Sequence, residues 1–350
     1  MSGATKIEFC HMTVNPLVGC SRKSPGCDHC YAVTMARRHG GNPKTPQYHG
    51  LTRMSIGGPE WTGEVRWVPG VLEKALVGLT LCRTSKRVFI CSMSDIAHEK
   101  ATLQHLANVY AFAAALPRHK IILITKRPDL LLLRTRALME RLENFRDTWD
   151  AARKQLYDAC NAAARARFSV NRDSKSALAL QNKAEAIGIL YADVRFPLKN
   201  VMLMATVEDQ ERLEERIEPM MELAARGWHT GLISEPMLSG IDPDRITISN
   251  EDGSGYNINA LEGTAWDEEN GELSTDLDGE VPAKAIEWFV CGMEQGPGRR
   301  LLDIRFAMAR ATECAIAGVP CFFKKDSYGR YPAQMPRHFP EWMLCDGEAK

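Results

Sequence analysis

The chain has 350 residues, 45% of them hydrophobic, and its 44 Lys and Arg residues balance 44 Asp and Glu residues. This length can bury one large core or two small ones. The sequence has no run of about 18 apolar residues that could cross a membrane, and residues 1–10 lack the apolar centre of a signal peptide. We therefore expect no membrane-spanning helix, and a cytoplasmic protein with no membrane partner.

The charge is unevenly distributed. Residues 1–128 hold 17 Lys and Arg against 7 Asp and Glu, whereas residues 242–285 hold 2 against 12. A basic half favours an anionic partner such as nucleic acid or a nucleotide. An ordinary solvated face fits the same composition, and both interpretations stay open.

Three cysteines, Cys20, Cys27 and Cys30, fall within eleven residues near the N-terminus. Thiolates bind soft and borderline metals strongly, and the turn at Pro25-Gly26 lets Cys20 fold back toward the Cys-x-x-Cys pair. A closed zinc site needs four protein ligands, whereas a [4Fe–4S] cluster held by three cysteines leaves one iron free for a substrate or cofactor. The count of three therefore favours a cluster. The other cysteines are predicted to be mostly core residues, because eleven cysteines in a reducing compartment form no disulfide framework.

Six short apolar runs are typical of buried parallel strands: residues 87–91, 120–125, 201–206, 230–234, 287–291 and 319–323. Helical patterns lie between them, at 101–116, 208–226 and 303–317. This alternation predicts an α/β fold with a parallel sheet. Together with a first strand that leads into the cysteine loop, it favours a partial or closed (β/α) barrel of about six to seven parallel units. No Gly-x-Gly-x-x-Gly follows an early strand, as a Rossmann sheet would require.

Two segments interrupt this alternation. Residues 130–199 are rich in Ala, Arg and Leu and predict a helical insert, either a hairpin or a lid. Residues 242–285 form an acidic insert with turn signals, which predicts an exposed β-rich or flexible segment. The main fold is then divided into residues 1–129, 200–241 and 286–350, and the last part includes a C-terminal tail.

In a parallel α/β barrel the active site lies at the carboxyl ends of the strands. Polar groups follow all six predicted strands: Ser92 and Asp95, Lys126 and Arg127, Glu208, Glu235, Glu294 and Arg300, and Lys324. Each alone fits a helix cap or a turn, and Asp209 could be only an N-cap. Their coincidence with the cysteine loop predicts one shared site.

Motifs in this order resemble those of the phage-associated three-Cys-motif family. That family is of largely uncharacterised function and looks like a divergent branch of the radical S-adenosylmethionine (SAM) superfamily. The matching pieces span residues about 10–325: Asn15-Pro16-x-x-Gly19-Cys20, Gly26-Cys27-x-x-Cys30-Tyr31-Ala32, Trp61-Thr62-Gly63, Ser92-Met93-Ser94-Asp95, Thr125-Lys126-Arg127-Pro128, Val207-Glu208-Asp209-Gln210, Ser234-Glu235-Pro236, Gly292-x-Glu294-x-Gly296 and Phe322-Phe323-Lys324. Two departures stand out. Six residues separate Cys20 from Cys27 where the superfamily has three, and this chain has Cys291-Gly292-Met293-Glu294-Gln295-Gly296 where the family usually shows Gly-Gly-Glu-Ser-Gly.

The resemblance implies an enzyme that uses a [4Fe–4S] cluster on Cys20, Cys27 and Cys30 to cleave SAM and to abstract hydrogen from a substrate. The implied cofactor-binding residues are Ser92, Asp95, Thr125, Glu208, Ser234, Glu235, Gly292 and Glu294. Lys126, Arg127, Arg300 and Lys324 are candidates for the anionic substrate. That substrate would be a nucleobase, a nucleotide or DNA, as in phage DNA modification in the host cytoplasm. An electron donor for the cluster is implied as a partner, and the oligomeric state is not predicted.

A second hypothesis is a zinc-stabilised nucleic-acid-binding protein without catalysis. One of His29, Cys10, His11 or His39 would then complete the site as the fourth ligand. The basic first 128 residues would contact phosphates. A third hypothesis is a non-catalytic barrel that has kept the cysteine loop.

Overall fold

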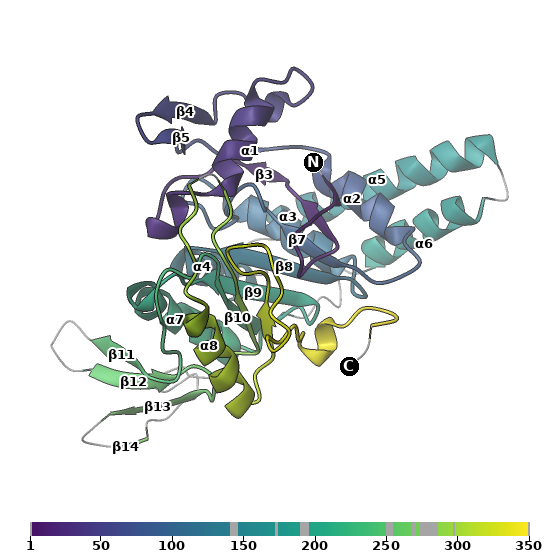
Figure 1. Cartoon of the computed structure of the whole chain (residues 1–350). Helices are drawn as coiled ribbons and strands as arrows, with labels where there is room; N and C mark the ends of the chain where they lie inside the picture. The colour runs from purple at the N-terminus through teal and green to yellow at the C-terminus, as the bar shows by residue number, and fades with distance from the viewer. Residues whose placement is uncertain are drawn as a thin grey trace.

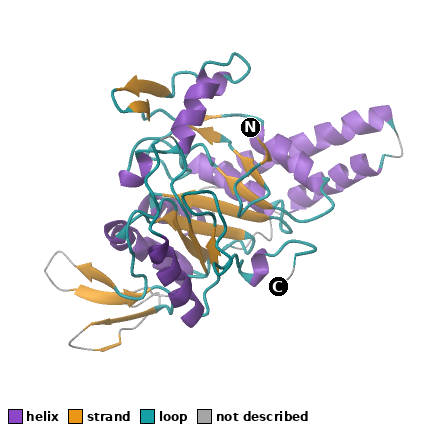
Figure 2. Ribbon diagram, viewed as in Figure 1, coloured by secondary structure: helices purple, strands orange, loops and turns teal. Residues whose placement is uncertain are grey.

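The computed structural model of the chain describes residues 2–140, 146–171, 174–189, 196–249, 255–267, 271–272, 286–296 and 298–348. An eight-stranded sheet lies at its centre (Figures 1 and 2). Its strands are β1 (Ser2–Ala4), β2 (Met12–Val14), β7 (Arg87–Ile90), β8 (Lys120–Thr125), β9 (Val201–Thr206), β10 (His229–Ser234), β15 (Trp288–Cys291) and β16 (Cys321–Phe323). The strands from β2 to β16 are parallel and stand side by side in chain order, while β1 pairs antiparallel with β2 at the edge.

The α/β class and the parallel sheet are confirmed, and the six predicted strands each begin within two residues of the expected position. The sheet is open across the described ranges: β1 and β16 form its two edges and do not pair. The closed form of the barrel is therefore wrong. A bridge from Phe322 to Arg337 covers part of the β16 edge, and at the other edge the antiparallel β1 covers β2.

Helices pack on one face of the sheet and form the larger hydrophobic core with it. They are α2 (Val71–Thr80), α3 (Leu103–Ala114), α4 (Pro128–Glu140), α7 (Gln210–Ala225) and α8 (Ile304–Ile316). Strand side chains alternate between the two faces: Val88 and Ile90 join this core, while Phe89 joins the other. Asp209 is the N-cap of α7 and accepts a hydrogen bond from the Arg212 amide at 2.8 Å, so its predicted capping role is confirmed.

The opposite face carries a smaller core of large side chains, including Trp288 and Phe322. The two ends of the chain cover it. Phe9 from the N-terminal segment and Met343 from the 3-10 helix η3 (Glu341–Met343) are buried there. This arrangement brings the N-terminal segment toward the carboxyl edge, where it helps to line a cavity.

The connection from β2 to α2 forms the upper part of the molecule in Figure 1. It consists of β3 (Leu17–Val18), η1 (Pro25–Cys27), α1 (Tyr31–Gly40), η2 (Pro46–Tyr48), β4 (Thr52–Ser55), β5 (Gly58–Trp61) and β6 (Arg66–Trp67). β4 and β5 form a hairpin, and β3 pairs with β6. The three motif cysteines lie in this connection, between β3 and α1.

The predicted helical insert contains a long hairpin of α5 (Arg146–Val170) and α6 (Lys175–Ile189). It packs against α2 and α3 and projects to one side of the molecule (Figure 1). None of its described residues lines the cavity, so it is a hairpin on the helical layer rather than a lid.

The acidic insert contains a four-stranded antiparallel sheet: β11 (Ile246–Ser249), β12 (Gly255–Asn259), β13 (Thr264–Asp267) and β14 (Gly271–Glu272). The β-rich prediction is therefore confirmed for the described part, while residues 250–254, 268–270 and 273–285 of the insert lie outside it.

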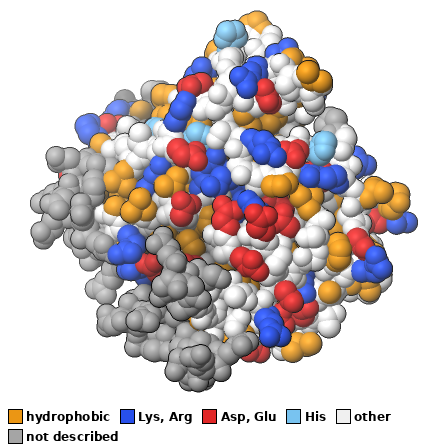
Figure 3. All heavy atoms as spheres, turned by 90° about the vertical axis from the view of Figure 1, so that its left-hand side faces the viewer, with side chains coloured by type: hydrophobic (Ala, Val, Ile, Leu, Met, Phe, Trp, Pro, Cys, Tyr) orange, Lys and Arg blue, Asp and Glu red, His pale blue; other side chains and the backbone are white. Residues whose placement is uncertain are grey.

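Figure 3 shows one face of the molecule, on which Asp and Glu side chains gather in the middle and Lys and Arg side chains surround them. The basic first 128 residues therefore do not make this face uniformly basic. Among the described residues, no helix has both the length and the apolar character needed to cross a membrane.

Candidate functional site

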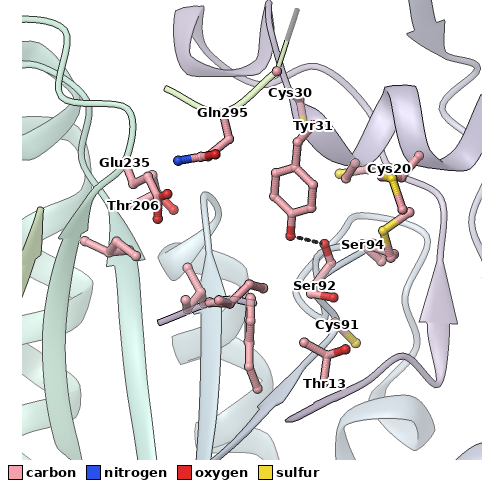
Figure 4. Close-up of a pocket in the computed structure, with 18 of the residues that line it drawn as sticks. Thr13, Cys20, Cys30, Tyr31, Cys91, Ser92, Ser94, Thr206, Glu235 and Gln295 are labelled. Atoms are coloured by element: carbon pink, nitrogen blue, oxygen red, sulfur yellow. Dashed lines mark hydrogen bonds between the residues drawn. The ribbon is translucent and has the colours of Figure 1, made fainter. Parts of the chain in front are cut away.

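A cavity of about 1040 Å³ opens at the carboxyl edge of the parallel sheet. Eleven of the fifteen predicted site residues line it: Cys20, Cys27, Cys30, Ser92, Asp95, Thr125, Lys126, Arg127, Glu235, Glu294 and Lys324. Glu208, Ser234, Gly292 and Arg300 are not among its lining residues. Figure 4 shows Cys20 and Cys30 on one side of the cavity, and Thr206 and Glu235 on the other.

The cysteine loop approaches the sheet closely where it begins. Gly19 has φ +90°, and a Cβ atom there would collide with the backbone carbonyl of Glu64. Its amide donates to the Met93 carbonyl at 3.1 Å, and Ser94 Oγ donates to its carbonyl at 2.5 Å. Glycine is thus required here by both conformation and space, and the loop is placed beside the end of β7.

The three thiols are half-buried at the cavity wall. Burial raises the pKa of Cys20, with a further rise from nearby Asp95, while the Arg127 guanidinium lowers it. Burial also raises the pKa of Cys30. A buried thiol with a raised pKa stays protonated, unless a metal takes the place of its proton. The chemistry of this donor set therefore fits a metal group better than a free nucleophile.

The spacing of the sulfurs distinguishes two kinds of metal group. A tetrahedral zinc ion with Zn–S bonds of about 2.3 Å holds its sulfurs roughly 3.8 Å apart. In the part of the chain that the structure describes, Cys20, Cys27 and Cys30 do not form a set with all sulfurs within 4.8 Å of one another. A cluster spreads its thiolates more widely, because each binds a different iron. Among the described residues, the three cysteines therefore do not form a compact tetrahedral ligand set for a single ion.

The predicted fourth zinc ligands lie in other contacts. His39 packs on the Tyr48 ring, with ring centroids 5.2 Å apart. His29 packs against Gly298, and Cys10 is buried in the smaller core. None of the described His, Cys, Asp and Glu side chains completes a compact ligand set with the motif cysteines.

A buried ion-pair network fastens the middle of the cysteine loop. Ser24 Oγ and Lys126 Nζ both donate to Glu208 Oε1, and Arg216 Nη1 donates to Oε2 at 2.7 Å. Burial alone would raise the pKa of Glu208, but Lys126 and Arg216 lower it, and the net pKa lies below its usual value. Gly26 approaches so closely that a Cβ atom would collide with Glu208. Glu208 was predicted to bind the cofactor; in the structure its carboxylate accepts from Ser24, Lys126 and Arg216 and holds the loop.

A second network fastens the loop at its first cysteine. Asp95 Oδ1 accepts from Thr125 Oγ1 at 2.7 Å, and Oδ2 accepts from Arg127 Nη1 at 3.2 Å. The backbone amides of Ala97 and Lys126 take the remaining acceptor sites of this carboxylate. Arg127 Nη2 also donates a hydrogen bond to Ser21 Oγ at 2.7 Å, and Ser21 directly follows Cys20. Asp95 lines the cavity, yet its acceptor sites are filled by the protein.

A third contact fastens the turn before Cys27. Glu294 Oε2 accepts from the Arg300 amide at 2.7 Å and from Arg300 Nε at 3.0 Å. Arg300 Nη2 also donates to the Pro25 carbonyl at 2.9 Å. Gly296, with φ +137°, lies against the His29 carbonyl, where a side chain would collide. Arg300 was predicted to bind the substrate; in the structure its side chain pairs with Glu294 and contacts the loop at Pro25.

The far side of the cavity carries groups that are not used to hold the loop. Lys324 Nζ pairs with Glu235 Oε1, and both side chains line the cavity. Thr206, at the end of β9, lies beside Glu235 (Figure 4). The two other predicted residues outside the lining, Ser234 and Gly292, are at the fully buried end of β10 and directly after β15.

Sequence reasoning missed several lining residues. Tyr31 donates from its hydroxyl to the Ser92 carbonyl at 2.8 Å, and burial raises its pKa well above the usual range. The sequence feature that could have indicated Tyr31 as a lining residue is its position directly after Cys30. The N-terminal residues 3–9 and Trp61 also line the cavity. No pattern near residues 3–9 indicated this, because only the packing of the chain end across the sheet brings them there.

Comparisons with known proteins give one extended match. The model of a family described as "Protein of unknown function (DUF5131)" matches residues 4–340. No curated protein matches the chain.

Among solved structures, three of spore photoproduct lyase resemble this chain. One is a tyrosine-to-phenylalanine mutant (TM-score 0.34), one is complexed with dinucleoside spore photoproduct (TM-score 0.35), and one is a double mutant with bound AdoMet and dinucleoside spore photoproduct (TM-score 0.35). Each is 12% identical, and each match covers 67% of this chain and 48% of that one. The chain thus spans about half the length of these proteins, and so slight a likeness carries no argument about the site.

Proposed function

We propose that this chain, which belongs to the DUF5131 family, is a radical SAM enzyme that acts on a nucleotide or nucleic acid. One observation carries the proposal: the three half-buried thiols of Cys20, Cys27 and Cys30 share one cavity wall at the carboxyl edge of the parallel sheet, where a cluster held by three thiolates would leave one iron open to the cavity. The resemblance to the phage-associated three-Cys-motif family stays a prediction.

Cys20, Cys27 and Cys30 would hold a [4Fe–4S] cluster through three of its irons. When bound, this cluster and SAM together supply reductive cleavage of a carbon–sulfur bond and removal of a hydrogen atom from the substrate. The protein's task is then to hold the loop rigidly, to position SAM and to exclude water. A separate electron donor is required as a partner.

The three fastening contacts give the predicted motif residues a positioning role. Glu208 with Lys126, Asp95 with Arg127, and Glu294 with Arg300 each hold the cysteine loop at a different point. Such buried, charge-assisted contacts favour one loop geometry. They come from the ends of different strands, so the loop is fixed to the sheet as a whole.

Glu235 and Lys324 are the best placed groups for SAM. SAM carries an amino group, a carboxylate and ribose hydroxyls, and the side-by-side carboxylate and ammonium complement such a zwitterion. Thr206 and Ser92, which line the same cavity, would contact the remaining polar groups. Residues 1–129, 200–241 and 286–350 would form the catalytic unit, and the segments 130–199 and 242–285 would be inserts that do not contact SAM.

The proposal is tested by anaerobic reconstitution with iron and sulfide, followed by analysis of iron, sulfide and zinc. The wild-type protein is expected to be brown, with about four irons per chain. Cys20→Ala, Cys27→Ala and Cys30→Ala are each expected to lose the cluster. Cys82→Ser, at a half-buried cysteine of another segment, is the matched control and is expected to keep it. One zinc per chain with no iron would instead support the zinc-stabilised nucleic-acid-binding protein.

Reduced, cluster-loaded protein is further expected to release 5′-deoxyadenosine from SAM slowly without substrate. If the cluster forms but SAM neither binds in calorimetry nor is cleaved, the radical SAM proposal is wrong.

A further inference from the structure

One wall of the cavity continues into an exposed turn after β16. Lys325 and Gly329 line the cavity, and Tyr328 and Tyr331 follow on the surface, with exposed fractions of 73% and 50%. Two exposed tyrosines on one short turn are unusual for a surface, because large aromatic rings are normally buried at least in part. We call Lys325, Tyr328, Arg330, Tyr331 and Arg337 the tyrosine rim.

The turn that presents Tyr328 is held by several hydrogen bonds. Asp326 Oδ1 accepts from the amides of Tyr328 and Arg330 at 2.9 and 2.8 Å, and the Gly329 amide donates to the Asp326 carbonyl at 2.9 Å. Ser327 Oγ accepts from the Leu302 amide at 2.7 Å, which ties the turn to the segment carrying Arg300. Tyr328 is thus displayed on an ordered turn. The turn itself therefore loses little conformational entropy when a partner stacks on the Tyr328 ring.

Cations lie on the tyrosine rings. The Arg330 guanidinium carbon is 4.8 Å from the centroid of Tyr328. Lys325 Nζ and the Arg337 guanidinium carbon are 5.0 and 4.6 Å from the centroid of Tyr331. These cation–π contacts hold the charges at the level of the rings, instead of letting them extend into solvent.

The balance of charge around the rim is positive. Residues 324–338 contain Lys324, Lys325, Arg330 and Arg337 against a single acid, Asp326. Glu8 pairs with Lys325 and Arg337, Asp326 pairs with Arg330, and Glu235 pairs with Lys324, so that these four cations exceed the three acids by one charge. An excess of cations beside exposed rings complements a polyanion that carries flat, unpaired rings.

We propose that the tyrosine rim binds single-stranded nucleic acid and feeds one nucleotide into the cavity. Proteins that bind single strands combine cations that contact the backbone with aromatic side chains on which bases stack. A duplex keeps its bases paired and stacked inside, so it offers little to these rings. This inference rests on the proposed function for the chemistry in the cavity, and it specifies the form of the substrate.

The test measures binding of fluorescently labelled oligonucleotides of about ten nucleotides to the full-length protein by anisotropy. Single-stranded DNA, single-stranded RNA and a DNA duplex of the same sequence are compared. Tyr328→Ala and Tyr331→Ala are each expected to weaken single-strand binding by about 5- to 150-fold, since a base–aromatic stack contributes roughly 1–3 kcal/mol. Tyr328→Phe and Tyr331→Phe keep the ring and are expected to bind like the wild type. Lys325→Gln is expected to lower the slope of log K against log salt by about 0.7.

Tyr157→Ala is the matched control, because Tyr157 is an exposed tyrosine on the distant hairpin helix α5. It should not change binding. The inference is wrong if the wild type does not bind single strands more tightly than about 0.1 mM in low salt, if the duplex binds as tightly as the single strand, or if the alanine variants bind normally. Specific capture of a protein on the rim without oligonucleotide binding would also overturn it.

Failure of the proposed function would look different. Oligonucleotide binding that depends on Tyr328, in a wild-type protein that holds no cluster and cleaves no SAM, would refute the radical SAM proposal and keep the tyrosine rim. Cluster loading and SAM cleavage without oligonucleotide binding would refute the tyrosine rim alone.

Discussion

Arg127 Nη1 donates to Asp95 Oδ2 at 3.2 Å, and both side chains are buried where β7 and β8 end. The pair joins the ends of two neighbouring strands. The Arg127 guanidinium also donates a hydrogen bond to Ser21, the residue after Cys20. An ion pair within the sheet edge therefore determines where the first cysteine of the motif lies.

Asp95→Asn is expected to destabilise the protein by about 1–3 kcal/mol, because it removes a charged acceptor from the buried Arg127, which keeps Glu99 as its other ion-pair partner. Urea unfolding measures the effect, and iron content after reconstitution should fall with it. Asp129→Asn is the control, since Asp129 is exposed in the first turn of α4 and should cost no more than about 1 kcal/mol. Equal losses in the two variants would contradict a special role for the Asp95–Arg127 pair.

Gly26→Ala is expected to prevent cluster assembly. The added Cβ would collide with the Glu208 carboxylate and lie 2.7 Å from Lys126 Nζ, so the loop must move away from its anchor. Gly41→Ala adds the same methyl group at the end of α1, where nothing lies within 4 Å. Iron per chain and the visible absorption of the cluster should drop only in Gly26→Ala. A fully loaded Gly26→Ala protein would show that this close approach is dispensable.

The stability of the protein should fall in acid partly through Glu208. Its pKa is lowered in the folded state because Lys126 and Arg216 outweigh the effect of burial. A carboxyl group with a lowered folded pKa contributes stability above its unfolded value of about 4.3, and this contribution is lost as the pH falls through the folded pKa. Thermal unfolding from pH 7 down to pH 3 should therefore show a steeper loss for the wild type than for Glu208→Gln. Parallel curves for the two proteins would contradict the assignment.

Lys324→Ala is expected to weaken SAM binding by roughly tenfold or more, because it removes a charged hydrogen-bond donor and leaves Glu235 unpaired in the cavity. The cluster content should be unchanged, since Lys324 lies on the side opposite the cysteines. Calorimetry with cluster-loaded protein measures the affinity, and Lys74→Ala on the exposed side of α2 serves as the control. Loss of the cluster in Lys324→Ala would place this residue with the loop instead of with SAM.

The strands of the parallel sheet and their burial could be predicted from local patterns. Runs such as Ile121-Ile122-Leu123 are apolar on both faces, and only a sheet that is covered on both sides buries them fully. The cysteine motif was equally visible, because the spacing of Cys20, Cys27 and Cys30 is a property of the sequence itself. The position of Asp209 directly before a helical pattern was also enough to predict that it caps α7.

The roles of the polar strand-end residues depended on the tertiary structure. Glu208 and Glu235 both follow a strand, and their sequence contexts predict the same role. Glu208 is buried between two cations: Arg216 in α7, the helix that follows Glu208, and Lys126, which directly follows the neighbouring strand β8. Glu235 instead lines the cavity and pairs with Lys324. Long-range contacts between charged groups decide such orientations, and periodicity along the chain carries no information about them. The same reason applies to the open sheet edge and to the tyrosine rim: both follow from which distant segments the fold brings together.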